Sequence, residues 1–173
     1  MEQGSAAWFS ARTGKLTASR MADAMDYLKS GKPSEARTKY MIEMVAERMS
    51  DYVVPHFVND AMRWGTEQEP AAKNAYFQIT GRFPEPCFFF DHFDIDFFGA
   101  SPDALIESDG LLEIKCPTTP THIRWVMHGE VPEAHKPQMA AQILCTGRKW
   151  VDFMSYDPRI SGGKKAFIKR WIP

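Results

Sequence analysis

The chain has 173 residues, of which 44% are hydrophobic, 13% aromatic and 25% charged, a composition typical of a soluble globular protein of about one domain. No run approaches the roughly 18 apolar residues of a membrane span, and the first residues lack the basic start and apolar core of a secretory signal. The three cysteines are odd in number and widely spaced, so we expect no disulfide framework, zinc ribbon or four-thiolate iron–sulfur cluster. We therefore expect one domain over residues 1–173 in a reducing cytoplasm, with no membrane attachment.

The net charge of −1 conceals an uneven distribution. Residues 1–48 hold eight Lys and Arg against six Asp and Glu, residues 49–145 hold six against fourteen, and residues 146–173 hold seven against two. Basic flanks around an acidic middle suit a protein that binds both a polyanion and a divalent metal ion. Chance clustering of solvated surface charge explains the pattern equally well, so charge alone leaves both interpretations open.

Along the chain, hydrophobic periodicity and turn residues predict helices alternating with groups of strands. Helices are expected near 18–29, 35–50, 66–80, 119–128 and 135–145, with Ser34 as the N-cap of the second. Strands are expected near 86–91, 94–98, 102–107, 111–116, 149–155 and 165–171. This order predicts an α/β (α+β) domain in which helices flank a central mixed β-sheet.

Three charged residues fall within two of the predicted strands. Asp109-Gly110 favours a tight type I′ turn, which makes 102–107 and 111–116 adjacent antiparallel strands. Asp103 and Glu113 then lie near each other across the ladder. Glu113 and Lys115 are two residues apart, so both point to one face of the sheet. The three groups are therefore predicted to converge among apolar neighbours.

Two neighbouring carboxylates repel each other unless a proton or a bound cation neutralises them. Oxygen ligands without convergent Cys or His suit Mg²⁺, with Mn²⁺ as a substitute. A lysine beside such a site can orient or deprotonate a metal-bound water and stabilise charge that develops on a phosphate. The alternative is an exposed cross-strand ion pair worth under about 1 kcal/mol, and the apolar neighbours favour the metal site over it.

Four segments, in order along the chain, resemble motifs of the PD-(D/E)xK nucleases and, more narrowly, of the lambda-type phage exonucleases of the YqaJ-like recombinase family. Pro102-Asp103, a hairpin and Glu113-x-Lys115 resemble the nuclease motif itself. The other three segments are AWFSARTGKLTASR at 7–20, MRWGTEQEPAAKNAYFQITG at 62–81 and KPQMAAQILCTGRKWVDFMSYDPR at 136–159.

The resemblance implies a role for each matching position in a PD-(D/E)xK core. Asp103 and Glu113 are implied as metal ligands, together with the main-chain carbonyl of Ile114. Lys115 is implied as the catalytic lysine. Glu69, from the helix that precedes the sheet, is implied to reach the metal through its carboxylate or a water molecule.

Further positions are implied around this centre. Gln138 matches a glutamine on the helix behind the lysine, and it counts among the implied catalytic residues. Arg12 and Ser19 match positions that hold the 5′-terminal phosphate of DNA, and Lys15 is a weaker candidate of the same kind.

The resemblance also implies an activity and partners. It implies a Mg²⁺-dependent exonuclease that degrades linear double-stranded DNA 5′→3′, releases mononucleotides and resects ends for recombination. It further implies a ring-shaped homo-trimer and pairing with a single-strand annealing recombinase. The setting would be the bacterial cytoplasm, for a phage or prophage protein.

Alternatives remain open on the residues alone. The same core serves endonucleases and end-processing nucleases, and a third possibility is a DNA-binding module that has lost catalysis. Thr66-x-x-Glu69 is also a capping box at the start of the expected helix, although Glu69 shares a face with Ala72 and Tyr76, and Glu67 does not. Arg12 and Gln138 could be ordinary surface residues, and the basic C-terminal residues could be a solvated face.

Overall fold

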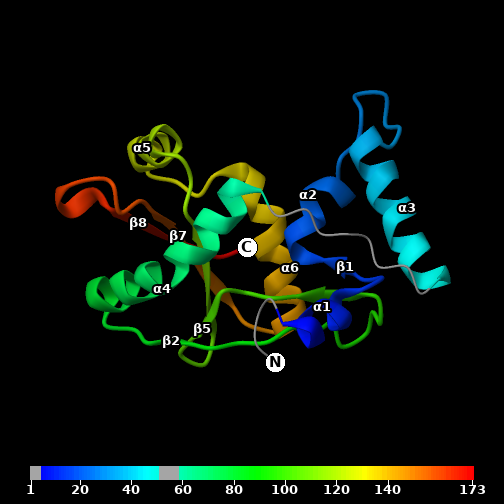
Figure 1. Cartoon of the computed structure of the whole chain (residues 1–173), viewed down its shortest axis with the longest axis horizontal. Coiled ribbons are helices and arrows are strands. Elements are labelled where there is room, and N and C mark those ends of the chain that lie inside the picture. The colour runs from blue at the N-terminus through cyan, green and yellow to red at the C-terminus, as the bar shows by residue number, and fades with distance from the viewer. Residues whose placement is uncertain (1–4, 51–58) are drawn as a thin grey trace. The chain divides into compact units, whose positions relative to one another are not determined.

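The computed structural model describes residues 5–50 and 59–173, which form two compact units. Of the described residues, unit 1 comprises 5–50, 88–101 and 134–147, and unit 2 comprises 59–87, 102–133 and 148–173. Each unit contains a β-sheet with helices against it, so the mixed α/β fold class is confirmed, although the strands divide between two sheets (Figure 1). Among the described residues, no helix is long and apolar enough to cross a membrane.

Unit 1 is built on a three-stranded sheet in the order β1-β4-β3. Strand β4 (Phe98–Ala100) pairs parallel with β1 (Leu16–Thr17) and antiparallel with β3 (Phe90–Asp91). The unit also contains α1 (Ala6–Arg12), α2 (Met21–Ala24), α3 (Glu35–Met49) and α6 (Lys136–Thr146). Its buried core consists of Ala18, Phe98, Ala100, Ala141 and Cys145.

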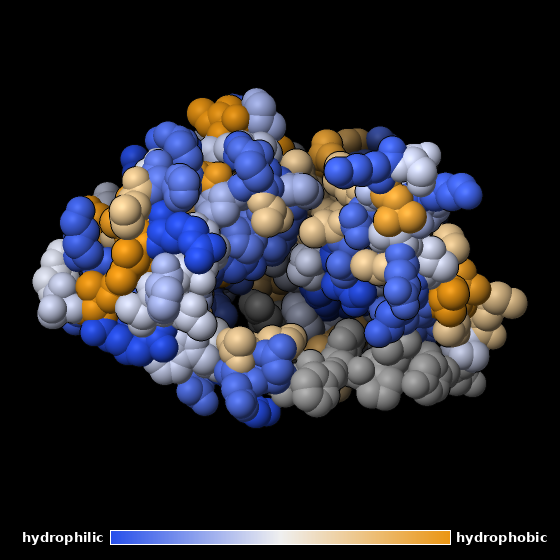
Figure 2. All heavy atoms as spheres, turned by 90° about the horizontal axis from the view of Figure 1, so that it is seen from above, coloured by the Kyte–Doolittle hydropathy of each residue, from blue (hydrophilic) through white to orange (hydrophobic). Residues whose placement is uncertain are grey.

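Helix α3 begins where the sequence predicts. The Ser34 side chain accepts a hydrogen bond from the backbone N–H of Arg37, which makes Ser34 the expected N-cap. Most of this helix is exposed, including Met41, Ile42 and Met49. On the face of the molecule in Figure 2, hydrophobic side chains likewise occur in small groups among hydrophilic ones.

The helix predicted over 18–29 is wrong in extent. The chain forms a 3₁₀ turn at Ala18–Arg20 and then the short helix α2, which ends at Ala24. Beyond it the chain reverses: Gly31 adopts φ +78°, and the Leu28 N–H donates to the Lys32 carbonyl at 2.9 Å. The turn residues that precede α3 therefore extend further back than the helical pattern suggested.

Unit 2 is built on a five-stranded mixed sheet in the order β2-β5-β6-β7-β8. The strands are β2 (Pro84–Glu85), β5 (Ala104–Ile106), β6 (Gly110–Lys115), β7 (Trp150–Tyr156) and β8 (Ala166–Trp171). Only β6 and β7 pair in parallel, and α5 (Thr119–His128) is the crossover helix that lies between them in sequence. The last four strands lie close to their predicted ranges.

Helices cover both faces of this sheet. Helix α4 (Asp60–Thr80) contributes Ala72 and Tyr76 to a core cluster with one face of the strands, which includes Leu112 and Ile114 of β6 (Figure 1). Alternate residues of a strand point to opposite faces, so Glu113 belongs to the other face. Helix α5 packs on that second face, where Trp125 makes an edge contact with Phe153, the neighbour of Glu113 in β7, and His122 bonds Ser155 at 2.7 Å.

The start of α4 differs from the prediction. The helix begins at Asp60, six residues before Thr66, and the Asn59 side chain caps it by accepting from the Met62 N–H. Thr66 donates to the carbonyl of Met62 within the helix, so Thr66 and Glu69 do not form a capping box. Pro70 consequently lies inside the helix, where its missing N–H removes one intrahelical hydrogen bond.

The hairpin between β5 and β6 is correct, but its predicted turn is not. Ile106 pairs with Gly110, so residues 107–109 form the turn, and Glu107 takes the left-handed conformation with φ 49°. Gly110 is a strand residue. A Cβ on Gly110 would overlap ring atoms of Trp150, so glycine is required here by the close approach of an indole.

We predict that Gly110→Ala destabilises the protein by about 1–3 kcal/mol, because the added methyl group forces Trp150 out of its position. Urea unfolding of the purified variant measures this. Gly163→Ala is the matched control, since nothing lies within 4 Å of the position of its Cβ, and we expect it to change stability by under roughly 0.5 kcal/mol. Equal decreases for the two variants would contradict the packing argument.

Candidate active site

The hairpin of unit 2 brings the two predicted carboxylates together. The pairing of Ala104 with Leu112 places Asp103 opposite Glu113 at the open end of the ladder. The Asp103 N–H donates to the Leu112 carbonyl at 3.1 Å, and the Asp103 side chain accepts from the Ile114 N–H at 2.6 Å. Both hydrogen bonds fix the Asp103 carboxylate against β6, so the predicted neighbourhood of Asp103 and Glu113 is confirmed.

Lys115 completes the cluster on the same strand. Its Nζ lies 2.6 Å from Oε1 of Glu113, as expected for residues that point to one face of β6. The Glu113 side chain is only 2% exposed, whereas that of Lys115 is 29% exposed. A buried carboxylate is therefore paired with an ammonium group that still reaches solvent. This arrangement differs from an ordinary cross-strand ion pair, in which both groups are exposed.

The cluster has unusual proton affinities. Burial, followed by repulsion from Glu113, raises the pKa of Asp103 well above its usual value, and Glu69 adds to the effect while Lys115 opposes it. Burial by itself lowers the pKa of Lys115, but attraction to Glu113 and Asp103 outweighs it, so the pKa is raised. Lys115 is thus charged at neutral pH in this arrangement, which suits orientation and charge stabilisation better than proton abstraction.

Glu69 lies on the predicted side of α4. It is half-buried while Glu67 is exposed, and its carboxylate accepts from Lys73 Nζ, one helical turn away, at 2.6 Å. Its repulsion of Asp103 shows that it lies within electrostatic range of the cluster. Lys73 was not predicted from the sequence, although its i, i+4 spacing from Glu69 indicates such a pair.

Two thiols near the carboxylates remain protonated. Burial and the negative charge of Asp103 raise the pKa of Cys87 to about 12 and that of Cys116 to about 11. Cys87 also donates its S–H to the Pro102 carbonyl at 2.7 Å. Metals bind thiolates rather than thiols, so the donor set available at neutral pH consists of oxygen atoms.

The residues of the cluster fit a hard divalent cation. A carboxyl group whose pKa is raised by a neighbouring carboxylate is one whose negative charge a cation would stabilise. Within residues 5–50 and 59–173, however, no group of three or more His, Cys, Asp and Glu side chains is arranged to hold a metal ion. The fit therefore rests on Asp103 and Glu113, with Glu69 held by Lys73 rather than gathered into a triad.

The predicted phosphate residues lie in unit 1. Arg12, at the end of α1, donates to the hydroxyl groups of Ser19 at 3.1 Å and Ser101 at 3.3 Å. Its guanidinium group lies 4.1 Å from the ring centroid of Trp8, whose indole N–H also donates to Ser101. Burial lowers the pKa of Arg12 to about 10, which leaves it charged at neutral pH. Ser101 was missed from sequence, although it directly precedes the Pro102-Asp103 motif.

The other unit 1 candidates are placed less distinctively. Lys15 forms an ion pair with Asp91 at 2.6 Å, so an anion would compete with that carboxylate. Thr17, which precedes the 3₁₀ turn that contains Ser19, makes no side-chain cap to that turn. Gln138 is half-buried in the first turn of α6, and its implied catalytic role stays a prediction.

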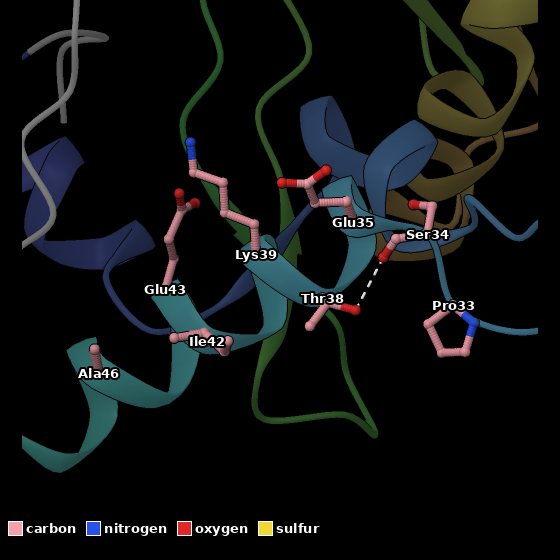
Figure 3. Close-up of a pocket in the computed structure, with 8 residues that line it drawn as sticks. All are labelled: Pro33, Ser34, Glu35, Thr38, Lys39, Ile42, Glu43 and Ala46. Carbon is pink, nitrogen blue, oxygen red and sulfur yellow. Dashed lines mark hydrogen bonds between the residues drawn. The ribbon is translucent and has the colours of Figure 1, made fainter.

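A cavity of about 630 Å³ lies elsewhere, along α3 (Figure 3). Figure 3 shows Glu35, Lys39 and Glu43 projecting from the helix, and Thr38 donating to the Ser34 carbonyl. None of the predicted site residues lines it; the lining residues are Pro33, Ser34, Glu35, Thr38, Lys39, Ile42, Glu43 and Ala46. Of its polar groups, Ser34 caps α3 and Glu43 pairs with Arg20 at 3.4 Å, so we do not take this cavity as the candidate site.

Comparison with known proteins agrees with the geometry. The sequence profile of the YqaJ-like viral recombinase domain matches residues 7–149. The chain belongs to this family. A comparison with curated protein sequences gave no match.

Solved structures support the assignment of this YqaJ-like domain. An alkaline exonuclease (LHK-Exo) from Laribacter hongkongensis is 41% identical, with a TM-score of 0.87 over 96% of this chain and 81% of the other. The structure of LHK-Exo in complex with dAMP gives 40% identity and a TM-score of 0.89 over 97% and 82%. A phage-related exonuclease from Haemophilus somnus 129PT, at 12% identity and a TM-score of 0.66 over 95% and 86%, shares the fold.

We predict that Asp103→Asn stabilises the metal-free protein at neutral pH, because it removes the repulsion between a half-buried carboxylate and the buried carboxylate of Glu113. The amide oxygen can still accept the Ile114 N–H. A carboxyl group with a raised folded-state pKa does not change the free energy of unfolding below its ordinary pKa of 3.8. As pH rises from there through the raised value, the group ionises more readily in the unfolded state, and the free energy of unfolding falls. The variant's advantage in melting temperature should therefore grow from acid to neutral pH in EDTA.

Asp109→Asn is the control for this prediction, since Asp109 lies in the same hairpin but forms a half-exposed pair with Lys149. We expect a change of under roughly 1 kcal/mol for it. A lower melting temperature for Asp103→Asn than for wild type across the whole pH range would show that the carboxylates do not repel each other.

Proposed function

We propose that this chain is a metal-dependent DNA exonuclease that degrades linear duplex DNA from 5′ ends and releases mononucleotides. The observation that carries the proposal is the Asp103–Glu113–Lys115 cluster on the hairpin of unit 2, in which the Glu113 carboxylate is buried. Its support from outside the site is the 40–41% identity, over nearly the whole chain, to a protein described as an alkaline exonuclease. We further propose that residues 1–173 form one nuclease domain, since the family profile at 7–149 extends over both units.

The roles follow from the chemistry of each group. Asp103 and Glu113, with the main-chain carbonyl of Ile114, are proposed to hold Mg²⁺, for which Mn²⁺ can substitute, and Glu69 assists directly or through water. The metal supplies charge neutralisation for the attacking and leaving oxygen atoms of the displacement. Lys115 remains charged, orients the attacking water and stabilises charge on the scissile phosphate. Gln138 is proposed as a further polar group of the site.

The 5′→3′ direction of degradation is assigned to Arg12. Arg12 and the Ser19 hydroxyl are proposed to hold the 5′-terminal phosphate, with Lys15 as an additional cation once it leaves Asp91. A guanidinium group that stacks on Trp8 and bonds two hydroxyl groups, rather than a carboxylate, keeps its positive charge available to an anion. End resection for recombination, a homo-trimeric ring and an annealing recombinase partner in the bacterial cytoplasm complete the proposal.

We predict that Lys115→Ala lowers the rate of DNA hydrolysis by at least about 100-fold, since the ammonium group acts on the reacting phosphate. The assay follows linear duplex DNA with 5′ phosphates and Mg²⁺, labelled at either the 5′ or the 3′ end. Wild type should release the 5′ label first, as mononucleotide, and EDTA should abolish the release. Lys149→Ala, which removes a surface lysine, should leave the rate unchanged. Internal fragments would identify an endonuclease, and no cleavage would favour a DNA-binding module.

We predict that Arg12→Gln removes the preference for phosphorylated ends. Wild type should prefer a 5′-phosphate over a 5′-hydroxyl end by roughly 10- to 100-fold in kcat/KM, the value of a charge-assisted hydrogen bond. The ratio for the variant should approach one. Arg37→Gln, which alters a half-buried arginine over the Tyr27 ring, is the control and should keep the wild-type ratio. A variant that retains full preference would remove Arg12 from phosphate recognition.

A further inference from the structure

The loop that joins β7 to β8, residues 157–165, extends from the catalytic edge of the unit 2 sheet. Strands β6 and β7 are parallel, and Lys115 at the end of β6 pairs with Ser155 near the end of β7. Both strands therefore finish at the same edge. The loop starts directly after β7 and is closed at its base by the Asp157 N–H, which donates to the Lys165 carbonyl at 2.8 Å.

The first part of the loop is fixed by Arg159. Its Nε donates to Asp157 at 2.7 Å, its Nη2 donates to Asp157 at 3.1 Å and to the Pro117 carbonyl at 2.9 Å, and its guanidinium group lies 4.7 Å from the Trp64 ring centroid. Pro117 is two residues beyond Lys115. Arg159 thus ties the loop to the segment that leaves the catalytic strand, while its side chain remains 47% exposed.

The second part of the loop is fixed by a buried histidine. His122 of α5 is fully buried, and its Nε2 lies 2.8 Å from the Lys164 carbonyl. Since a carbonyl can only accept, Nε2 carries the proton and Nδ1 accepts from the Ser155 hydroxyl at 2.7 Å. The backbone at Lys164 is therefore held in place, although the Lys164 and Lys165 side chains are exposed.

The charge that this loop presents is positive throughout. Its only acidic residue, Asp157, is buried and is neutralised by Arg159 and by a hydrogen bond from Thr119. The exposed charges are those of Arg159, Lys164 and Lys165. Gly162 and Gly163 lie between Arg159 and Lys164, and nothing lies within 4 Å of where a Cβ would be at either glycine. The backbone there is therefore open to a bulky ligand.

We propose that this loop is a second DNA-contacting surface, which binds backbone phosphates of the duplex beyond the scissile end. A held backbone with exposed cations and no exposed acidic group suits a polyanion, and the shared edge with Lys115 places the contact on the substrate of the catalytic cluster. The inference rests on the proposed function for the identity of that polyanion. It assigns to Lys164 and Lys165 a role in binding and processivity, and none in the chemical step.

The test compares Lys164→Gln/Lys165→Gln with Lys29→Gln/Lys32→Gln, which removes the same charge from an exposed loop of unit 1. Neither lysine of the first pair uses its side chain in the hydrogen bonds that hold the loop, so the fold should persist. The probe is a fluorescent 5′-phosphorylated duplex in EDTA, titrated over a series of salt concentrations. For the loop variant, the slope of log affinity against log salt should be shallower by about 0.9 for each phosphate that the protein no longer neutralises.

Steady-state hydrolysis with Mg²⁺ supplies the second measurement: KM for long duplex should rise in the loop variant and kcat should not change. A salt slope equal to that of the control variant overturns the inference while the proposed activity stands. If wild type binds duplex with the expected slope but hydrolyses no DNA, the proposed activity fails and the loop remains a DNA-contacting surface. A fall in kcat at saturating duplex with an unchanged KM also overturns it, because the lysines would then act on catalysis.

Discussion

The hydrogen bond from the Ile114 N–H to the Asp103 carboxylate is the interaction on which the site depends. It holds a carboxylate against the central strand of the unit 2 sheet, beside a second carboxylate that is almost fully buried. Bringing ionised groups out of water costs several kcal/mol each, against a total stability of about 5–15 kcal/mol for a typical domain. The other core positions of this hairpin are aliphatic. Such an arrangement is expected where a bound cation offsets the desolvation free energy of the carboxylates.

The remaining architecture of unit 2 keeps β6 rigid around that pair. Strand β6 lies between β5 and β7, and its apolar face packs against α4 through Leu112 and Ile114. The opposite face carries Glu113 and Lys115 next to the strand that α5 covers. Because β6 and β7 end at one edge, the charged end of the catalytic strand and the basic β7–β8 loop share a side of the sheet. The parallel pairing thus places the proposed catalytic cluster and the proposed DNA-contacting loop on one side of the sheet.

Unit 1 contributes a different kind of electrostatic site. Within residues 5–50 and 59–173, Arg12 is held by an indole ring and two hydroxyl groups instead of a carboxylate, and burial lowers its pKa to about 10, which leaves it charged at neutral pH. Acidic residues dominate the cluster proposed to bind a cation, and Arg12, proposed to bind an anion, has neutral hydrogen-bond partners. Separate provisions for a metal and for a phosphate are what a nuclease with a defined polarity requires.

The sequence by itself determined the strands around the catalytic motif, the neighbourhood of Asp103, Glu113 and Lys115, the cap of α3 and the family, because these depend on local spacing, strand alternation and contiguous motifs. It did not determine the start of α4, which is capped by Asn59 and not by the equally plausible capping box at Thr66. It also did not determine the turn at residues 107–109, because Gly110 is a strand residue packed against the ring of Trp150. The sequence likewise did not predict the contact of Arg12 with Ser101 or that of Arg159 with the Pro117 carbonyl. The start of α4 is a choice between two local caps, and the local pattern supports both. The other three features join residues that are far apart in sequence. Only the tertiary structure decides them, because a local pattern contains no information about which side chain will fill a distant space.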